Sequence, residues 1–108
     1  MTMVKKSNIR NLFMGRPKWL RDSLAQQYWL QNGKCFYCHE MLMISKHEKG
    51  VPSPRKMITV DHIVPVSVGG KKKSLIVAAC YRCNTKRGSM PWLDFVALTN
   101  ARLKCKSQ

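Results

Sequence analysis

The chain has 108 residues, and its 20 lysines and arginines against 5 acidic residues give a formal net charge of +15 at pH 7. This length fits one domain with a modest core. Such a basic domain predicts a polyanionic partner, and nucleic acid is the leading candidate. No run approaches the ~18 apolar residues that a membrane span needs, and no long basic amphipathic helix stands out, so no membrane partner is expected.

The N-terminal residues are basic and show little hydrophobic periodicity. We expect a basic, partly mobile arm over residues 1–15 and a single domain over residues 16–108. The first residues are charged and lack the apolar core of a signal peptide, which predicts a cytoplasmic protein in a reducing environment.

Two helices are expected to flank the centre of the chain. The first covers residues 17–32, where Pro17 suits the first turn and Gly33 suits the stop. The second begins after Ser89, with Pro91 in its first turn. Each segment repeats apolar residues at helical spacing, namely Trp19, Leu20, Leu24 and Tyr28 in the first and Trp92, Leu93, Val96, Ala97 and Leu103 in the second.

Four of the five cysteines form two Cys-x-x-Cys pairs, Cys35 with Cys38 and Cys80 with Cys83. In a reducing compartment, two such pairs indicate zinc rather than disulfides. Four thiolates make a closed tetrahedral site with no open position, so we assign this zinc to folding rather than to catalysis. The string Cys-x-x-Cys-His, which ends at His39, also matches covalent haem attachment, but that interpretation leaves the second pair unexplained.

The stretch from residue 57 to residue 88 predicts two strands followed by a short helix. A β-branched run over residues 57–63 is expected as the first strand, and Gly69-Gly70 permits the turn that follows. Residues 75–79 then return as an antiparallel second strand, and the helix runs from Cys80 to about Gly88.

Asp61 and His62 stand at the end of the first predicted strand. Neighbouring strand residues point to opposite faces, but at a strand end the chain can turn both side chains toward one cleft. Asp61 offers a hard oxygen for Mg²⁺ or a similar ion. His62 can accept a proton from water near neutral pH. An isolated Asp-His pair is more often structural, so the assignment depends on the residues around it.

The surrounding residues resemble the signature of HNH endonucleases. The resemblance rests on Asp-His-Ile-Val-Pro from Asp61, on Gly69-Gly70, and on Cys-x-x-Cys-Asn-x-Lys-x-Gly from Cys80 to Gly88. The earlier cysteine pair matches the zinc-containing, four-cysteine branch of that family. The resemblance implies an α+β fold with a ββα-metal core over residues 35–88, in which a hairpin and a helix surround one divalent ion. The four-cysteine zinc knuckle joins this core, and the N-terminal and C-terminal helices flank it.

The resemblance also implies an activity, the hydrolysis of nucleic-acid phosphodiester bonds, and DNA is the expected substrate. Because so short a chain is not expected to carry a second recognition domain, we expect low intrinsic sequence specificity. His62 would be the general base, and Asp61 and Asn84 would hold a catalytic Mg²⁺ or Mn²⁺. One residue departs from the family pattern, because Leu75 stands where members usually carry an asparagine that braces the loop and the base. This departure concerns catalytic rate more than fold.

Several cations lie beside the predicted site, where they could bind phosphates of the nucleic acid. They are Arg82, Lys86 and Arg87, on or just after the predicted helix, and Lys71, Lys72 and Lys73, after the glycine turn. For any single one of them, solubility is an equally good explanation.

Two other functions stay open. A zinc-knuckle module that binds nucleic acid with little or no cleavage would account for the charge, the cysteines and Leu75. A basic structural protein of a ribonucleoprotein would leave Asp61 and His62 without a function. Within the nuclease interpretation, the chain would nick one strand as a monomer or cut both strands as a homodimer. Its small size suits a phage or mobile element, by analogy alone.

Overall fold

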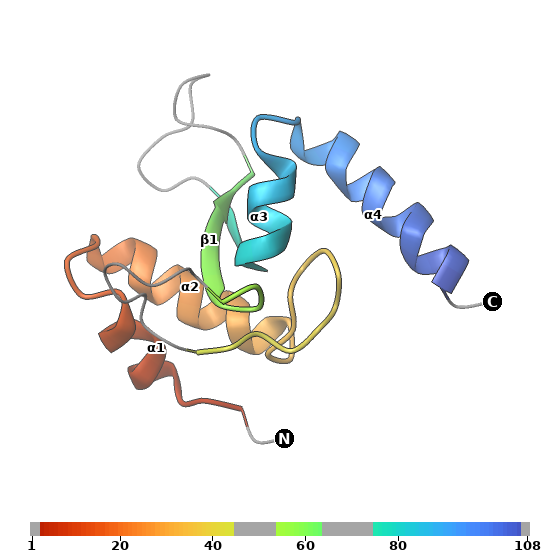
Figure 1. Ribbon diagram of the computed structural model, residues 1–108. Helices are drawn as coiled ribbons and strands as arrows, with labels where there is room; N and C mark the ends of the chain where they lie inside the picture. The colour runs from red at the N-terminus through yellow and green to blue at the C-terminus, as the bar shows by residue number, and fades with distance from the viewer. Residues whose placement is uncertain (1–2, 45–53, 64–74, 107–108) are drawn as a thin grey trace.

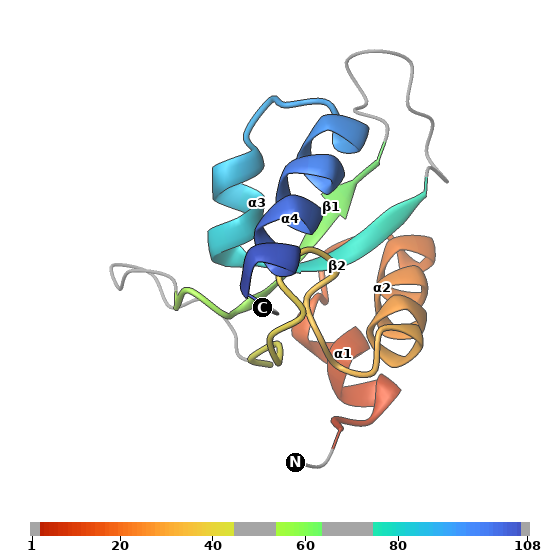
Figure 2. The ribbon, with the colours of Figure 1, turned by 90° about the vertical axis from the view of Figure 1, so that its right-hand side faces the viewer.

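A computed structural model describes residues 3–44, 54–63 and 75–106, with side chains as far as residue 103 (Figure 1). The elements are α1 (Lys6–Leu12), α2 (Lys18–Leu30), β1 (Ile58–His62), β2 (Ile76–Cys80), α3 (Tyr81–Arg87) and α4 (Trp92–Lys106). The two strands pair as an antiparallel sheet that lies between α2 and α3 (Figure 2). Within these described segments, no helix is long and apolar enough to cross a membrane.

Helix α2 contributes much of the core because its apolar side chains return at every fourth position. Leu20, Leu24 and Tyr28 are all buried on this face. After the helix ends, Gly33 has a φ of +73° and donates its N–H to the Tyr28 carbonyl at 2.8 Å. A Cβ atom at Gly33 would lie 3.2 Å from the Tyr28 hydroxyl oxygen. Both the backbone angle and this close approach favour glycine, as expected for the stop of the helix.

Strands β1 and β2 pair in regular register, from Ile58 opposite Cys80 to His62 opposite Ile76. All five residues of β2 are buried. The Gln31 side-chain amide satisfies backbone groups on the outer edge of β2. Its Nε2 donates to the Ala78 carbonyl at 2.8 Å, and its Oε1 accepts from the Ala78 N–H at 3.0 Å. The predicted order of strand, strand and helix is therefore confirmed, with α3 starting directly after β2.

Helix α4 packs on the loop that carries the first cysteine pair. The rings of Phe95 and Tyr37 meet edge to face with centroids 4.8 Å apart, and those of Trp92 and Phe36 lie 5.6 Å apart. Aromatic pairs of this kind contribute about 0.5–1.5 kcal/mol each beyond the area they bury. The last helix thus holds the cysteine loop in place.

Helix α1 lies in the segment that was expected to be an arm with little regular structure. Ile9 is completely buried. The Val4 N–H donates to the Tyr28 hydroxyl at 3.1 Å, and Trp29 Nε1 donates to the Val4 carbonyl at 3.2 Å. Residues 3–12 are therefore tied to α2, and a short helix lies within the segment expected as an arm.

Candidate active site and metal centre

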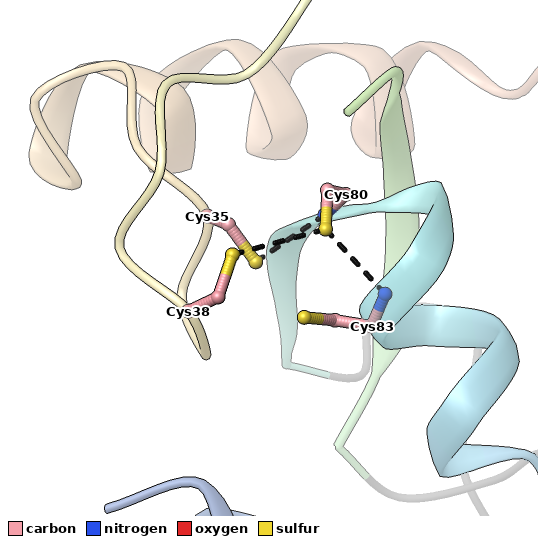
Figure 3. A group of neighbouring side chains, drawn as sticks. All are labelled: Cys35, Cys38, Cys80 and Cys83. Carbon is pink, nitrogen blue, oxygen red and sulfur yellow. Dashed lines mark hydrogen bonds between the residues drawn. The ribbon is translucent and has the colours of Figure 1, made fainter. Parts of the chain in front are cut away.

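The four cysteines of the two predicted pairs meet between the loop after α2 and the start of α3 (Figure 3). Their sulfur atoms lie within 4.8 Å of one another, and the sulfurs of Cys38 and Cys80 are 3.9 Å apart. Four sulfurs bound to one tetrahedral zinc ion at about 2.3 Å would lie ~3.8 Å apart. Both the donor set and its spacing therefore fit zinc. Among the described residues, this is the only group of three or more His, Cys, Asp or Glu side chains that could hold a metal ion.

Backbone N–H groups point at these sulfur atoms. The N–H groups of Tyr37 and Cys80 donate to Cys35 Sγ, and that of Cys83 donates to Cys80 Sγ, each at 3.4 Å. The hydrogen bond from the Cys35 side chain, followed by that from Cys83, lowers the pKa of Cys80 to about 4. This geometry arises because β2 ends and α3 begins at Cys80, whose sulfur caps the new helix. These surroundings favour the thiolate form of Cys80, the form that a zinc ion requires, whereas the hydrogen bonds with Cys35 and Cys80 raise the pKa of Cys83.

A cleft of about 430 Å³ runs along β1 and is lined by both His62 and Asn84. The Asn84 amide Nδ2 donates to Thr59 Oγ1 at 3.0 Å and to the Val60 carbonyl at 3.1 Å. These two bonds fix the side chain against β1 and leave Oδ1 as its acceptor atom. The structure therefore brings two of the three predicted catalytic residues to one cleft.

Asp61 does not line this cleft. It is only 6% exposed, and its Oδ1 accepts from Arg87 Nη1 while its Oδ2 accepts from the Tyr37 hydroxyl. The same Arg87 nitrogen donates to the His62 carbonyl at 2.9 Å. Because the strand register stays regular through His62, neighbouring side chains keep opposite directions. The expected turn of Asp61 and His62 toward one cleft is therefore not present.

The two partners of Asp61 both retain the protons that they donate. Burial, followed by the hydrogen bond to Asp61 and its charge, raises the pKa of Tyr37. Burial alone would lower the pKa of Arg87, but the hydrogen bond to Asp61 and its charge outweigh this effect and raise the pKa overall. Sequence reasoning did not identify Tyr37, because nothing in its position between two predicted zinc ligands points to Asp61.

The predicted phosphate-binding residues do not form one group. Arg82 and Lys86 line a different groove, together with Arg102 of α4. Arg87 is 6% exposed and paired with Asp61, so its guanidinium is not presented to solvent as a phosphate contact requires. The predicted cations at residues 71–73 lie outside the described residues.

These features define a small α+β domain with a four-cysteine cluster that fits zinc, and with a cleft that holds a histidine and an amide. The model of a family described as HNH endonuclease matches residues 50–91, which include β1, β2, α3 and the second cysteine pair. The match covers less than half of the chain, and over that segment it confirms the resemblance to HNH endonucleases. No curated protein and no solved structure matches this chain.

Proposed function

We propose that this chain is a metal-dependent endonuclease that hydrolyses DNA phosphodiester bonds. The observation that carries the proposal is the placement of His62 and Asn84 in one cleft, inside the segment that matches HNH endonucleases. The net charge of +15 supports a polyanionic substrate, and the proposed cleavage has low intrinsic sequence specificity.

His62 is the proposed general base. It is half-buried at the end of β1, where its side chain lines the cleft. Its backbone carbonyl accepts from Arg87, which anchors the end of the strand. An imidazole in this position can accept a proton from a water molecule that attacks phosphorus in line.

Asp61 and Asn84 are the proposed ligands of a catalytic Mg²⁺ or Mn²⁺. Carboxylate and amide oxygens are the donor types that these ions prefer. Asn84 Oδ1 is available for this role, whereas both Asp61 oxygens accept hydrogen bonds from Arg87 and Tyr37, with which an ion would compete. When bound, such an ion would offset negative charge on the phosphate.

A nucleic-acid-binding module with little or no cleavage is the second candidate. Two observations favour it, the pairing of Asp61 and the exposure of Leu75. Leu75 is 72% exposed directly before β2, where the family pattern has an asparagine. Its apolar side chain cannot supply the hydrogen bonds with which an asparagine would brace the loop and the base.

Cleavage of a supercoiled plasmid by the zinc-loaded protein, in Mg²⁺, in Mn²⁺ or without either ion, tests the proposal. We expect nicked or linear product with Mg²⁺ or Mn²⁺ and none without them, and a rate lower by ~100-fold or more in His62→Ala. His39→Asn is the matched control, because His39 is exposed, does not line the cleft and has a φ of +63°, a backbone angle that asparagine tolerates. Salt-sensitive DNA binding without cleavage in any ion would favour the second candidate instead. The ratio of nicked to linear product also distinguishes action on one strand from cleavage of both strands, for which a homodimer is the simplest arrangement.

A further inference from the structure

The cleft that holds His62 and Asn84 has a second wall outside the segment that matches HNH endonucleases. This wall is the turn between α1 and α2, which contributes Phe13 and Arg16 to the lining. The cleft is therefore bounded on one side by β1 and α3, and on the other by a part of the chain for which the family resemblance makes no statement.

The backbone of Arg16 is fixed on both sides. Its N–H donates to the Phe13 carbonyl at 3.0 Å, and its carbonyl accepts from Arg21 Nε at 3.1 Å. Gly15, with a φ of +99°, supplies the backbone angle that reverses the chain directly before it. The Arg16 side chain nevertheless remains exposed. The turn thus holds a solvent-accessible guanidinium at the edge of the cleft.

The charge of Arg16 has no acidic partner among the described residues. The ion pairs found there are Arg10 with Asp22, Lys56 with Glu40, and Arg87 with Asp61. The lining of the cleft contains no carboxylate, and Arg16 is its one residue with a permanent charge. An anion that enters the cleft would therefore meet an uncompensated positive charge in the same lining as His62.

We propose that Arg16 binds a backbone phosphate of the DNA next to the phosphate that is cut, an inference that rests on the proposed nuclease function. A guanidinium binds phosphate through two parallel hydrogen bonds, which places as well as attracts the anion. Arg87, expected in this role, is buried against Asp61, and Arg82 and Lys86 line another groove. The alternative is a solvated arginine that acts through net charge alone.

Binding of a short fluorescent DNA duplex to the zinc-loaded protein, measured by anisotropy without added Mg²⁺ or Mn²⁺, tests this role without cleavage. All variants carry His62→Ala, and Arg16→Ala is compared with Arg102→Ala, which removes the same charge from an exposed position in the other groove. We expect Arg16→Ala to weaken binding roughly tenfold and to reduce the slope of log K against log salt by about one. Arg102→Ala should weaken it about twofold or less. Arg16→Lys should retain part of the affinity, because it keeps the charge but not the fork of donors.

Equal losses and equal salt slopes for Arg16→Ala and Arg102→Ala would overturn the proposal, because they would show an effect of net charge alone. An absence of DNA binding by the parent protein would overturn it too. Failure of the wild-type protein to cut plasmid counts against the nuclease function, whereas the anisotropy comparison tests Arg16 by itself. Circular dichroism should show an unchanged fold, since the Arg16 side chain is exposed.

Discussion

The cysteine cluster and the cleft lie beside the same short helix, α3, but the cluster is mostly buried whereas the cleft is open. At the cluster, four soft ligands face one another, and three of them are buried. At the cleft, polar groups of β1 and α3 line an open space of about 430 Å³. Cys83 and Asn84 are neighbours in the first turn of α3, yet one belongs to the cluster and the other to the cleft. A closed site can therefore hold the fold while the adjacent side of the helix stays accessible to a substrate.

One hydrogen-bonded network joins these two regions. Tyr37 lies between Cys35 and Cys38, and its hydroxyl donates to Asp61 at the end of β1. Arg87, in the last turn of α3, donates to the other oxygen of Asp61. The position of the proposed catalytic carboxylate therefore depends on the loop that the cysteine cluster holds.

The largest expected effect comes from opening the cluster. Cys80→Ser removes one of four zinc ligands, and zinc binding contributes folding energy on the scale of the whole stability of a small domain, about 5 kcal/mol or more. We expect a loss of bound zinc and an unfolded far-ultraviolet circular dichroism spectrum. Cys105→Ser, which changes the cysteine outside the two pairs, is the control and should keep one zinc per chain. A folded Cys80→Ser protein, or zinc-free wild-type protein with a native spectrum, would contradict this assignment.

The next effect concerns the ion pair of this network, between Arg87 of α3 and Asp61 of β1. The side chains of Arg87 and Asp61 are 5% and 7% exposed. Arg87→Met would leave a buried carboxylate without its cation, which costs about 3 kcal/mol. Denaturant unfolding followed by circular dichroism measures this loss. The double variant Asp61→Leu, Arg87→Met removes both charges and should recover much of the stability. A loss below ~1 kcal/mol in the single variant Arg87→Met would show that the pair is not desolvated.

Tyr37→Phe should have a smaller effect that depends on pH. The lost hydrogen bond is worth about 1 kcal/mol. Because the pKa of Tyr37 is raised, the folded state favours the neutral hydroxyl. Its contribution is therefore complete below about pH 10 and decreases as the pH rises above that value. Unfolding at about pH 8 and about pH 10.5 should show a smaller alkaline loss in Tyr37→Phe than in the wild-type protein.

Tyr81→Phe is the matched control for this comparison, because Tyr81 is 39% exposed and makes no contact with Asp61 among the described hydrogen bonds. It should follow the wild-type curve. An identical pH dependence in Tyr37→Phe and the wild-type protein would mean that the phenol does not stabilise the folded state through Asp61.

The smallest effect is expected for the three lysines at residues 71–73, whose positions are known only from the sequence. Their replacement by alanine should weaken DNA binding evenly across sequences and reduce the salt slope by about 0.9 for each lost phosphate contact. A titration with duplexes of different sequence measures both quantities. An unchanged slope would show that these lysines point away from the DNA.

Local patterns were sufficient to predict the parts of the fold that depend on neighbouring residues. The β-branched run at residues 58–62, the glycine stop after α2 and the start of α3 at the second cysteine pair each follow from spacing within a few positions. The meeting of the two cysteine pairs was also predictable, because one tetrahedral ion needs four ligands.

The surroundings of Asp61 were not predictable in this way. Its partners Tyr37 and Arg87 are 24 and 26 positions away, and its direction depends on a strand register that the sequence does not specify. Helix α1 has only seven residues, too few for a clear hydrophobic period. Arg16 reaches the cleft because a turn reverses the chain before α2, a consequence of tertiary packing rather than of local pattern.

The most direct test measures zinc content and plasmid cleavage on the same preparations of wild-type protein and His62→Ala. If the cysteines hold the fold and the cleft carries the reaction, both proteins contain one zinc per chain. The variant then cuts at least ~100-fold more slowly in Mg²⁺ or Mn²⁺. Cleavage by His62→Ala at the wild-type rate, with zinc and fold intact, would contradict the assignment of the reaction to this cleft.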